Sequence, residues 1–236
     1  SPTGPAFEGA QISCGQRAAL GAIERVRIDS DTLSPKFRII GSDLWSDDPG
    51  FVEATADFGV TGICGSGIIE AVAEMFLAGL VTPAGLIDGK RFPDCPWLMP
   101  DGEVYSYRLH EGHTPVVISQ TDIRAIQLAK AALYAGARLL MDTLGVQTPD
   151  RIVLAGAFGS YIDPKHAMII GMIPDCPIEH VRAAGNAAGT GARIALLNRT
   201  ALAEIEELVR NIEKIETAVD PGFQDSFVAA MSLPHS

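Results

Sequence analysis

The sequence lacks any pair of cysteines close enough to form a local metal-binding motif. Its four cysteines, Cys14, Cys64, Cys95 and Cys176, are scattered along the 236 residues. Because structural zinc and iron–sulfur sites usually draw on C-x-x-C spacings, a local cluster framework is disfavoured. His110 and His113 form an H-x-x-H pair without further ligands nearby, so no metal site is expected. Scattered thiols are typical of a cytosolic protein, and we expect a cytoplasmic location.

Runs of basic or of apolar residues are also missing. The net charge of −11 would repel a phosphate backbone, so no nucleic-acid partner is expected. No apolar stretch approaches the roughly 20 residues that span a bilayer, and no basic segment followed by an apolar one indicates a signal peptide. The chain opens without Met, at Ser1-Pro2-Thr3-Gly4-Pro5, which is typical of the middle of a longer sequence. We therefore interpret it as a fragment, without contact to a membrane.

What is present is an ordinary globular composition, with 47% hydrophobic and 20% charged residues. Strand-like segments alternate with helix-like ones, which favours an α/β layer structure in one compact lobe. Ser119, followed by Asp122, resembles a capping box at the start of a long helix that ends at Gly145 and is apolar over much of its surface. The predicted strands are 24–28, 37–41, 116–118 and 151–155, and the other predicted helices are 68–80, 191–197 and 201–217.

Three glycine-rich segments are the candidate functional loops. Gly65-Ser66-Gly67 and Gly189-Thr190-Gly191 each open a predicted helix, where backbone N–H groups and the helix dipole favour an anion. Gly156-Ala157-Phe158-Gly159 instead follows a strand, where a nucleoside can lie across exposed backbone. Small residues between packed elements would look the same, so both interpretations stay open for each loop. Neither the P-loop lysine pattern nor a complete G-x-G-x-x-G after a strand occurs.

The order of these motifs along the chain resembles one protein family. The resemblance is to the ferredoxin-linked reductive activators of corrinoid proteins, and it covers essentially the whole sequence. The segments that carry it are 4–10 (GPAFEGA), Arg17-Ala18, 61–70 (TGICGSGIIE), 120–124 with 127–132 (QTDIR and QLAKAA), 154–159 (LAGAFG) and 185–189 (GNAAG).

That resemblance implies an architecture and an activity. Such activators carry an N-terminal plant-type 2Fe–2S domain, a linker and a two-lobed ATPase of the actin/chaperone/sugar-kinase type. They couple ATP to the return of an inactive Co(II) corrinoid to Co(I) for methyl transfer. Residues 1–236 would then form the C-terminal lobe, an actin-like, ribonuclease H-like fold with a mixed sheet flanked by helices. The first lobe, the iron–sulfur domain and the Asp-x-Gly-Thr phosphate hairpins would lie outside this sequence, so we expect the fragment alone to be inactive.

The resemblance also implies site residues. Gly156, Ala157, Phe158 and Gly159 match the adenosine motif, and Gly185, Asn186 and Gly189 match a connecting motif near the hinge between lobes. Gln127 and Lys130 lie on the helix that leans against adenine and ribose in chaperone ATPases; a solvated helix charge is the alternative for Lys130. The residues expected near the phosphates are Gly4, Glu8, Gly9, Gly65, Ser66 and Gly67. Glu8 has the alternative of capping a turn.

Cofactors and partners follow from the same resemblance. ATP and Mg²⁺ are implied for the lobe, a 2Fe–2S cluster only for the missing domain, and the corrinoid protein of a methyltransferase system as partner; a homodimer is left open. The segment at Cys64 is similar to the Cys-Ala-Ala-Gly-Thr-Gly loop of activators of 2-hydroxyacyl-CoA dehydratases, but Cys64 is off the cluster position. Such an activator, a small-molecule kinase, and a non-catalytic docking module for a corrinoid protein remain alternatives on the same fold.

Overall fold

The computed structural model describes residues 6–156, 158–217 and 220–234. Its N-terminal half is built on a three-stranded mixed sheet of order β2-β1-β3. Strand β1 (Ala22–Ile28) pairs antiparallel with β2 (Pro35–Ile39) and parallel with the short β3 (Gly62–Ile63). A 3-10 turn, η1 (Ala6–Glu8), precedes this sheet, and the short helix α1 (Phe51–Ala54) lies between β2 and β3. The alternation of buried and half-exposed residues along β1 confirms the strand that its sequence pattern predicts.

Helix α2 (Gly65–Leu77) follows β3 directly and packs on β1. Ten of its residues are buried, among them the charged Glu70, so the helix forms the centre of the core. A second sheet, of order β4-β5-β6, contains β4 (Leu98–Asp101), β5 (Val104–His110) and β6 (Val116–Ile118), all antiparallel. The Trp- and Tyr-bearing segment between α2 and β6 is therefore a packed hairpin, whose Tyr107 is fully buried.

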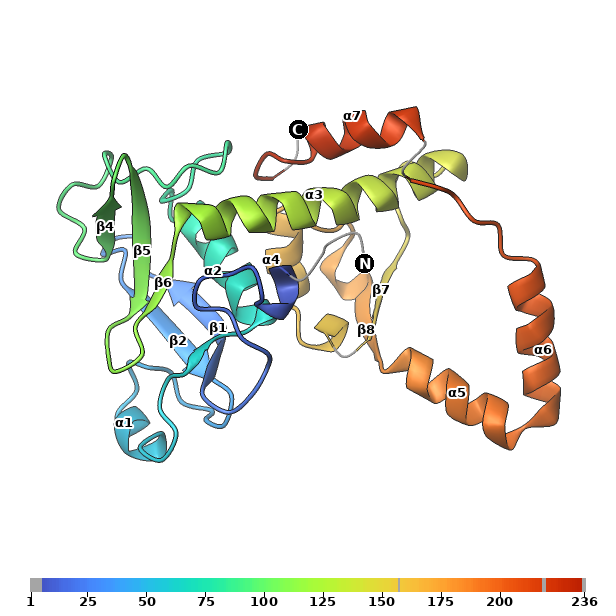
Figure 1. Ribbon diagram of the computed structural model, residues 1–236, viewed down its shortest axis with the longest axis horizontal. Helices are drawn as coiled ribbons and strands as arrows, with labels where there is room; N and C mark the ends of the chain where they lie inside the picture. The colour runs from blue at the N-terminus through green and yellow to red at the C-terminus, as the bar shows by residue number, and fades with distance from the viewer. Residues whose placement is uncertain (1–5, 157, 218–219, 235–236) are drawn as a thin grey trace.

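Helix α3 (Gln120–Thr143) runs along the length of the molecule and joins its two halves (Figure 1). The predicted capping box is confirmed: the Ser119 hydroxyl accepts from the Asp122 N–H, and the Asp122 carboxylate accepts from the Ser119 N–H at 2.8 Å. The expectation that the helix is largely buried is wrong for its C-terminal half, where Leu140 is exposed. Only its N-terminal part meets the core.

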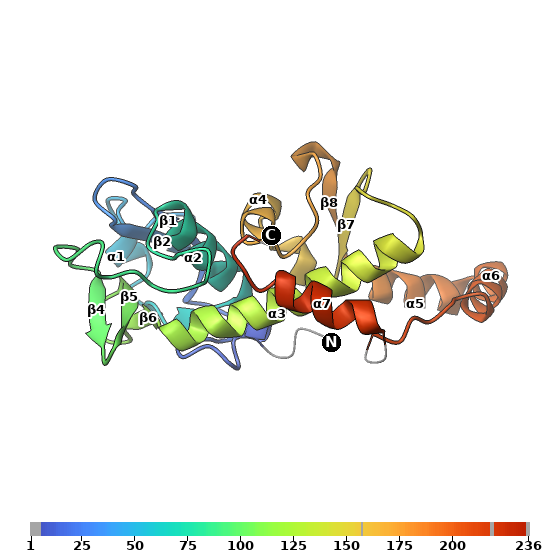
Figure 2. The same ribbon diagram turned by 90° about the horizontal axis from the view of Figure 1, so that it is seen from above.

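The C-terminal half contains a two-stranded parallel sheet of β7 (Ile152–Ala155) and β8 (Val181–Gly185). The turn η2 (Phe158–Ser160) and helix α4 (Pro164–Ile169) connect the strands, and η3 (Ile178–His180) precedes β8. Helices α5 (Ala187–Leu197) and α6 (Arg199–Arg210) extend away from the rest in both views, whereas α7 (Pro221–Ala229) returns to lie along α3 (Figures 1 and 2).

Two further outcomes concern the helices. The predicted helix 201–217 ends earlier, at Arg210, because Asn211 turns its side chain back to the carbonyl of Glu207. Among the described residues, none of the helices combines the length and the apolarity that crossing a membrane requires. The arrangement is the predicted α/β type, although the strands form three small sheets rather than one.

Candidate functional site

A cleft of about 630 Å³ lies where the two halves meet. Its size falls within the range of ligand pockets, which run from about 300 to 1,000 Å³. One side comes from the first sheet and the start of α2, and the other from the turn that follows β7. The lining residues are Phe7, Gln16, Arg17, Ala18, Glu24, Ile40, Cys64, Gly65, Ser66, Phe158 and Tyr161.

The floor of the cleft is the N-terminus of α2. Cys64 is the N-cap residue, and its side chain makes no capping hydrogen bond. Its thiol is buried and lies 3.3 Å from the Ile23 carbonyl and 3.4 Å from the Ser66 hydroxyl. A helix start without a side-chain cap leaves backbone N–H groups free, and these favour an anionic group through their partial positive charge. The start of α2, at Gly65 and Ser66, therefore brings a partial positive charge to this end of the cleft.

The opposite wall is aromatic. The ring of Phe158 stacks on that of Phe7, with 5.8 Å between the ring centroids. It also covers Gly65 so closely that a Cβ there would lie 2.5 Å from Phe158 Cε2 and 1.9 Å from the Phe7 carbonyl oxygen. Only glycine fits at this position. Tyr161 is 58% exposed and completes the wall.

Charged side chains are few around the cleft. Among the described lining residues, Arg17 is the cation and Glu24 the carboxylate. Glu24 is partly neutralised by Arg38, whose Nε lies 3.5 Å from it, whereas Arg17 is exposed to solvent. The cleft thus offers apolar rings, a free guanidinium and a helix N-terminus, which together suit a ligand with a flat ring and an anionic tail.

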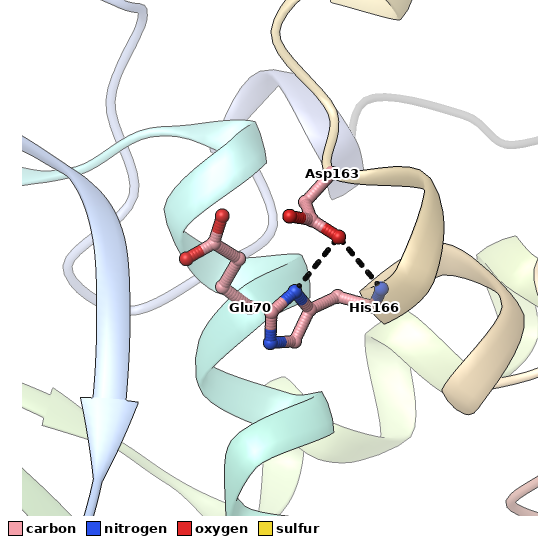
Figure 3. A group of neighbouring side chains, drawn as sticks. All are labelled: Glu70, Asp163 and His166. Atoms are coloured by element: carbon pink, nitrogen blue, oxygen red, sulfur yellow. Dashed lines mark hydrogen bonds and ion pairs between the residues drawn. The ribbon is translucent and has the colours of Figure 1, made fainter. Parts of the chain in front are cut away.

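Behind the cleft lies a buried network of charges. Glu70 of α2 is completely buried; it accepts hydrogen bonds from Arg25 Nη1 at 2.8 Å, from Arg27 Nη1 at 2.6 Å and from the Val26 N–H at 3.0 Å. One turn further along α2, Glu74 lies 2.7 Å from His166 Nε2. Asp163 Oδ1 lies 3.0 Å from Nδ1 of the same ring, a contact that Figure 3 shows, so the imidazole is held between the carboxylates of Glu74 and Asp163.

These neighbours change the pKa values of the network. Desolvation lowers the pKa of His166, but the contacts of its ring with the Asp163 and Glu74 carboxylates outweigh it and raise the pKa to about 9. The hydrogen bond to His166 holds the pKa of the Asp163 carboxyl well below its usual range. The pKa of Glu74 is also lowered: burial alone would raise it, but the bonds from His166 and the Ile28 N–H prevail. At neutral pH the imidazole is therefore a cation that links α2 to α4.

Glu70, Asp163 and His166 also have the composition of a metal site, since one ligand atom of each lies within 4.8 Å of the others. The surrounding charges argue against it. Both oxygens of Glu70 already accept from arginines, and a divalent cation would be repelled by these guanidinium groups and by a protonated His166. The group fits an ion-pair network better than a metal centre.

The structure brings together only some of the residues that the sequence predicts as a site. Gly65, Ser66 and Phe158 line the same cleft. Gly156 donates to the carbonyl of Gly185 at 2.8 Å, so the loops after β7 and β8 lie side by side. Asn186 caps α5 through the N–H of Gly189 and does not line the cleft. Gly159 packs against Leu154, outside the cleft.

Other predicted residues have structural partners instead. Gly67 packs on the Ile23 carbonyl and Gly9 on the backbone of Gln16, where a Cβ would lie 2.2 and 2.4 Å from the nearest atoms. Gly4 and Ala157 lie outside the described residues, as does the side chain of Glu8. Neither Gly9 nor Gly67 lines the cleft.

Gln127 and Lys130 face the C-terminal segment. Gln127 Nε2 donates to the Met231 carbonyl at 2.8 Å, and Lys130 Nζ donates to the carbonyls of Ser232 and Pro234. Lys130 is completely buried, so its interpretation as a solvated helix charge is wrong. Both side chains are bonded to this segment, and neither lines the cleft.

Sequence reasoning missed part of the cleft. Phe7, Gln16, Arg17, Glu24 and Tyr161 line it without belonging to a glycine loop. Phe7 and Arg17 lie inside segments that carry the family resemblance, and this resemblance was the signal that could have identified them as site residues. Tyr161 closely follows the predicted adenosine motif, but its exposure at the cleft depends on how the η2 turn folds.

Comparison with known proteins identifies the family. The family described as the C-terminal domain of RACo, the ASKHA domain, matches residues 1–236. The chain belongs to this family. A curated relative, the corrinoid activation enzyme RamQ of Eubacterium limosum, is 35% identical over 95% of this chain and 37% of its own length. The Co(II) methylated amine-specific corrinoid protein reductase of Methanosarcina barkeri is 26% identical over 97% of this chain and 41% of its own.

A solved structure agrees with both sequence comparisons. The reductive activator for corrinoid, iron–sulfur protein superposes with a TM-score of 0.82 at 35% identity, over 98% of this chain and 35% of that one. The ASKHA-type fold expected from the sequence is thus confirmed. The RACo-type chain described here spans roughly two fifths of the length of these relatives.

Proposed function

We propose that this ASKHA lobe binds ATP in a protein that reductively activates a corrinoid protein, returning cobalt from Co(II) to Co(I) for methyl transfer. Three relatives whose names describe corrinoid activation or reduction support this proposal, and each aligns with nearly the whole chain. The observation that carries the nucleotide assignment is the meeting of Gly65-Ser66, at the start of α2, with Phe158 of the predicted adenosine motif in one cleft.

The chemistry of the cleft fits a nucleotide. The aromatic wall of Phe158 and Tyr161 suits a base, because ring stacking tolerates any heterocycle with a π-face. Arg17 and the start of α2 suit the phosphates. Glu24, already paired with Arg38, is the carboxylate of the described lining and offers little for Mg²⁺. We infer that the main metal ligands come from the preceding lobe, as the family resemblance implies, so the isolated lobe should show negligible turnover.

A nucleotide at this position would act by shifting populations. The cleft lies between two substructures, so a ligand that touches both walls favours the closed arrangement by its difference in affinity for the two states. In the proposed activator this closure would favour a complex in which the corrinoid accepts an electron. The electron itself would come from the 2Fe–2S domain, which the resemblance places outside residues 1–236.

Titration calorimetry of Mg-ATP and Mg-ADP into the full-length protein tests the nucleotide site. Arg17→Ala removes the cleft cation, and Arg210→Ala removes another exposed cation, at the end of α6, as the control. We expect the Kd to rise about tenfold in the first variant and to stay unchanged in the second, since a charge-assisted hydrogen bond contributes about 1.5–3 kcal/mol. No binding to the wild-type protein would refute the ATP site.

The second candidate is a docking module for the corrinoid protein with no nucleotide of its own. The exposed apolar residues of α5 and α6 favour it, because they offer a surface rather than a pocket. If calorimetry shows no nucleotide binding but the full-length protein still forms a complex with its corrinoid partner, this alternative is supported. The dehydratase-activator alternative depends on a cluster cysteine, and the buried position of Cys64 does not favour it.

A further inference from the structure

One guanidinium group connects the two walls of the cleft. Arg25 Nη1 donates to Glu70 Oε1 at 2.8 Å and to the carbonyl of Tyr161 at 3.0 Å. Arg25 belongs to β1 and Glu70 to α2, on one side, whereas Tyr161 follows the η2 turn on the other. A second hydrogen-bonded link, between His166 of α4 and Glu74 of α2, lies further from the cleft.

The position of this guanidinium is fixed from behind. Glu70 is completely buried, and its carboxylate is also bound by Arg27 and by the Val26 N–H. A buried carboxylate with three donors cannot rotate without losing hydrogen bonds that water does not replace. Arg25 is consequently held in one orientation, with an N–H directed at the Tyr161 carbonyl.

The held carbonyl lies at the end of the aromatic wall. Tyr161 N–H donates to the Phe158 carbonyl at 3.0 Å, so the turn from Phe158 to Tyr161 is a single closed unit. A bond that fixes the Tyr161 end of this turn also restrains its Phe158 end, where the aromatic ring covers Gly65. The sequence gives no hint of this role, since Arg25 is one of several alternating polar residues on a strand.

We propose that Arg25, anchored by Glu70, is a positioning residue that sets the width of the cleft by holding the Phe158–Tyr161 turn against the start of α2. Without it the turn moves away from Gly65, and the buried thiol of Cys64 below becomes accessible. Because the cleft is the proposed nucleotide site, the same contact would set nucleotide affinity; that consequence rests on the proposed function, whereas the effect on cleft width does not.

The test uses Arg25→Met in the full-length protein, with peptide-resolved iodoacetamide labelling of each cysteine. Removing a hydrogen bond from a charged donor favours the open turn, so we expect the labelling rate of Cys64 to rise about tenfold. Cys14 and Cys95 serve as internal references, because global unfolding would raise their rates in parallel. Arg25→Lys retains a donor and the charge, and it should restore much of the protection of Cys64.

Arg108→Met is the matched control. The Arg108 side chain is 24% exposed, as is that of Arg25, and it likewise binds a carboxylate, of Glu111, and a carbonyl, of Pro96, at 3.2 Å. It belongs to β5, away from the cleft, so its loss should leave Cys64 protected. An unchanged Cys64 rate in Arg25→Met, or an equal rise in both variants, would overturn the proposal.

Calorimetry on the same variants separates the two questions. Arg25→Met should raise the Kd for Mg-ATP about tenfold and Arg108→Met should not. If the wild-type protein binds no nucleotide while Cys64 labelling behaves as expected, the proposed function fails and the role of Arg25 stands. If nucleotide binds normally to Arg25→Met although Cys64 is exposed, the turn does not contribute to affinity, and that part of the inference is wrong.

Discussion

His166 makes stability depend on pH in a direction opposite to that of its carboxylate partners. Its imidazole lies between Glu74 and Asp163 and is nearly inaccessible to solvent, and its pKa is raised to about 9 from an ordinary 6.5. A group with a raised pKa stabilises the folded state fully below its unfolded pKa and loses this contribution as the pH rises through the folded value. The stabilisation is therefore complete in mild acid and lost above pH 9.

The size of the effect follows from the two pKa values. Between about pH 6 and about pH 8, the linkage relation gives a loss of about 2 kcal/mol in the free energy of unfolding. The variant His166→Gln cannot titrate, so its free energy of unfolding should change by less than about 0.5 kcal/mol from this source. Lys130, with a pKa lowered by burial to about 8, contributes equally to both proteins. The difference between them isolates the histidine.

Urea denaturation monitored by fluorescence of Trp45 and Trp97 measures this difference, since both tryptophans lie in the N-terminal half that packs around α2. We expect the free energies of wild type and variant to converge as the pH rises. Parallel curves for the two proteins would show that folding leaves the pKa of His166 unchanged, and the raised value would then be wrong. A gap that widens with pH would show that it is held neutral, and the ion pairs with Glu74 and Asp163 would then be ruled out.

Three further changes have effects that can be stated from single contacts. Lys130→Met leaves the carbonyls of Ser232 and Pro234 without their donor, so the C-terminal segment should be released, with a loss of about 1–3 kcal/mol and faster carboxypeptidase digestion. Gly65→Ala places a Cβ 1.9 Å from the Phe7 carbonyl, so a cost of about 1–3 kcal/mol in thermal unfolding and a disturbed cleft are expected. Ser119→Ala removes the cap of α3 and should cost about 1 kcal/mol in urea denaturation; no loss would show that Asp122 alone caps the helix.

Local patterns predicted much of the fold. The capping box at Ser119 and Asp122 works within one turn of helix, and the alternation in β1 reflects burial on one side of a sheet; both can be recognised in a short window of sequence. The end of α6 could not be recognised in this way. Its apolar spacing continues past Arg210, but the helix stops where Asn211 bonds back to Glu207.

The site was predictable only in part, because its glycines can be recognised from local sequence whereas the burial of its charged residues cannot. Position 65 requires glycine because Phe7 and Phe158 approach its backbone closely, and a glycine-rich segment at a helix start can suggest such an approach. The burial of Glu70 and Lys130 depends on partners distant in sequence: Arg25 is 45 residues away from Glu70, and Ser232 is 102 residues away from Lys130. A charged residue in an otherwise apolar helix looks the same whether it faces solvent or an ion pair, so only the tertiary structure distinguishes the two.

The buried core is concentrated in the N-terminal half of the chain, and this affects which form of the protein is suitable for binding experiments. Strand β8 and helices α5 and α6 contain no buried residue in the part of the chain that the structure describes, and Leu196 is 84% exposed. An apolar surface of this kind is rarely left in water by a working protein. At the end of β8, the Gly185 carbonyl accepts a hydrogen bond from the N–H of Gly156, which lies two residues before Phe158. Helix α5 follows directly from this strand, so a partner that covered α5 and α6 would also restrain the turn that carries Phe158. In the isolated lobe this wall would be less restrained, so weak nucleotide binding by the lobe alone would not contradict the site. Absence of nucleotide binding by the full-length protein would contradict it.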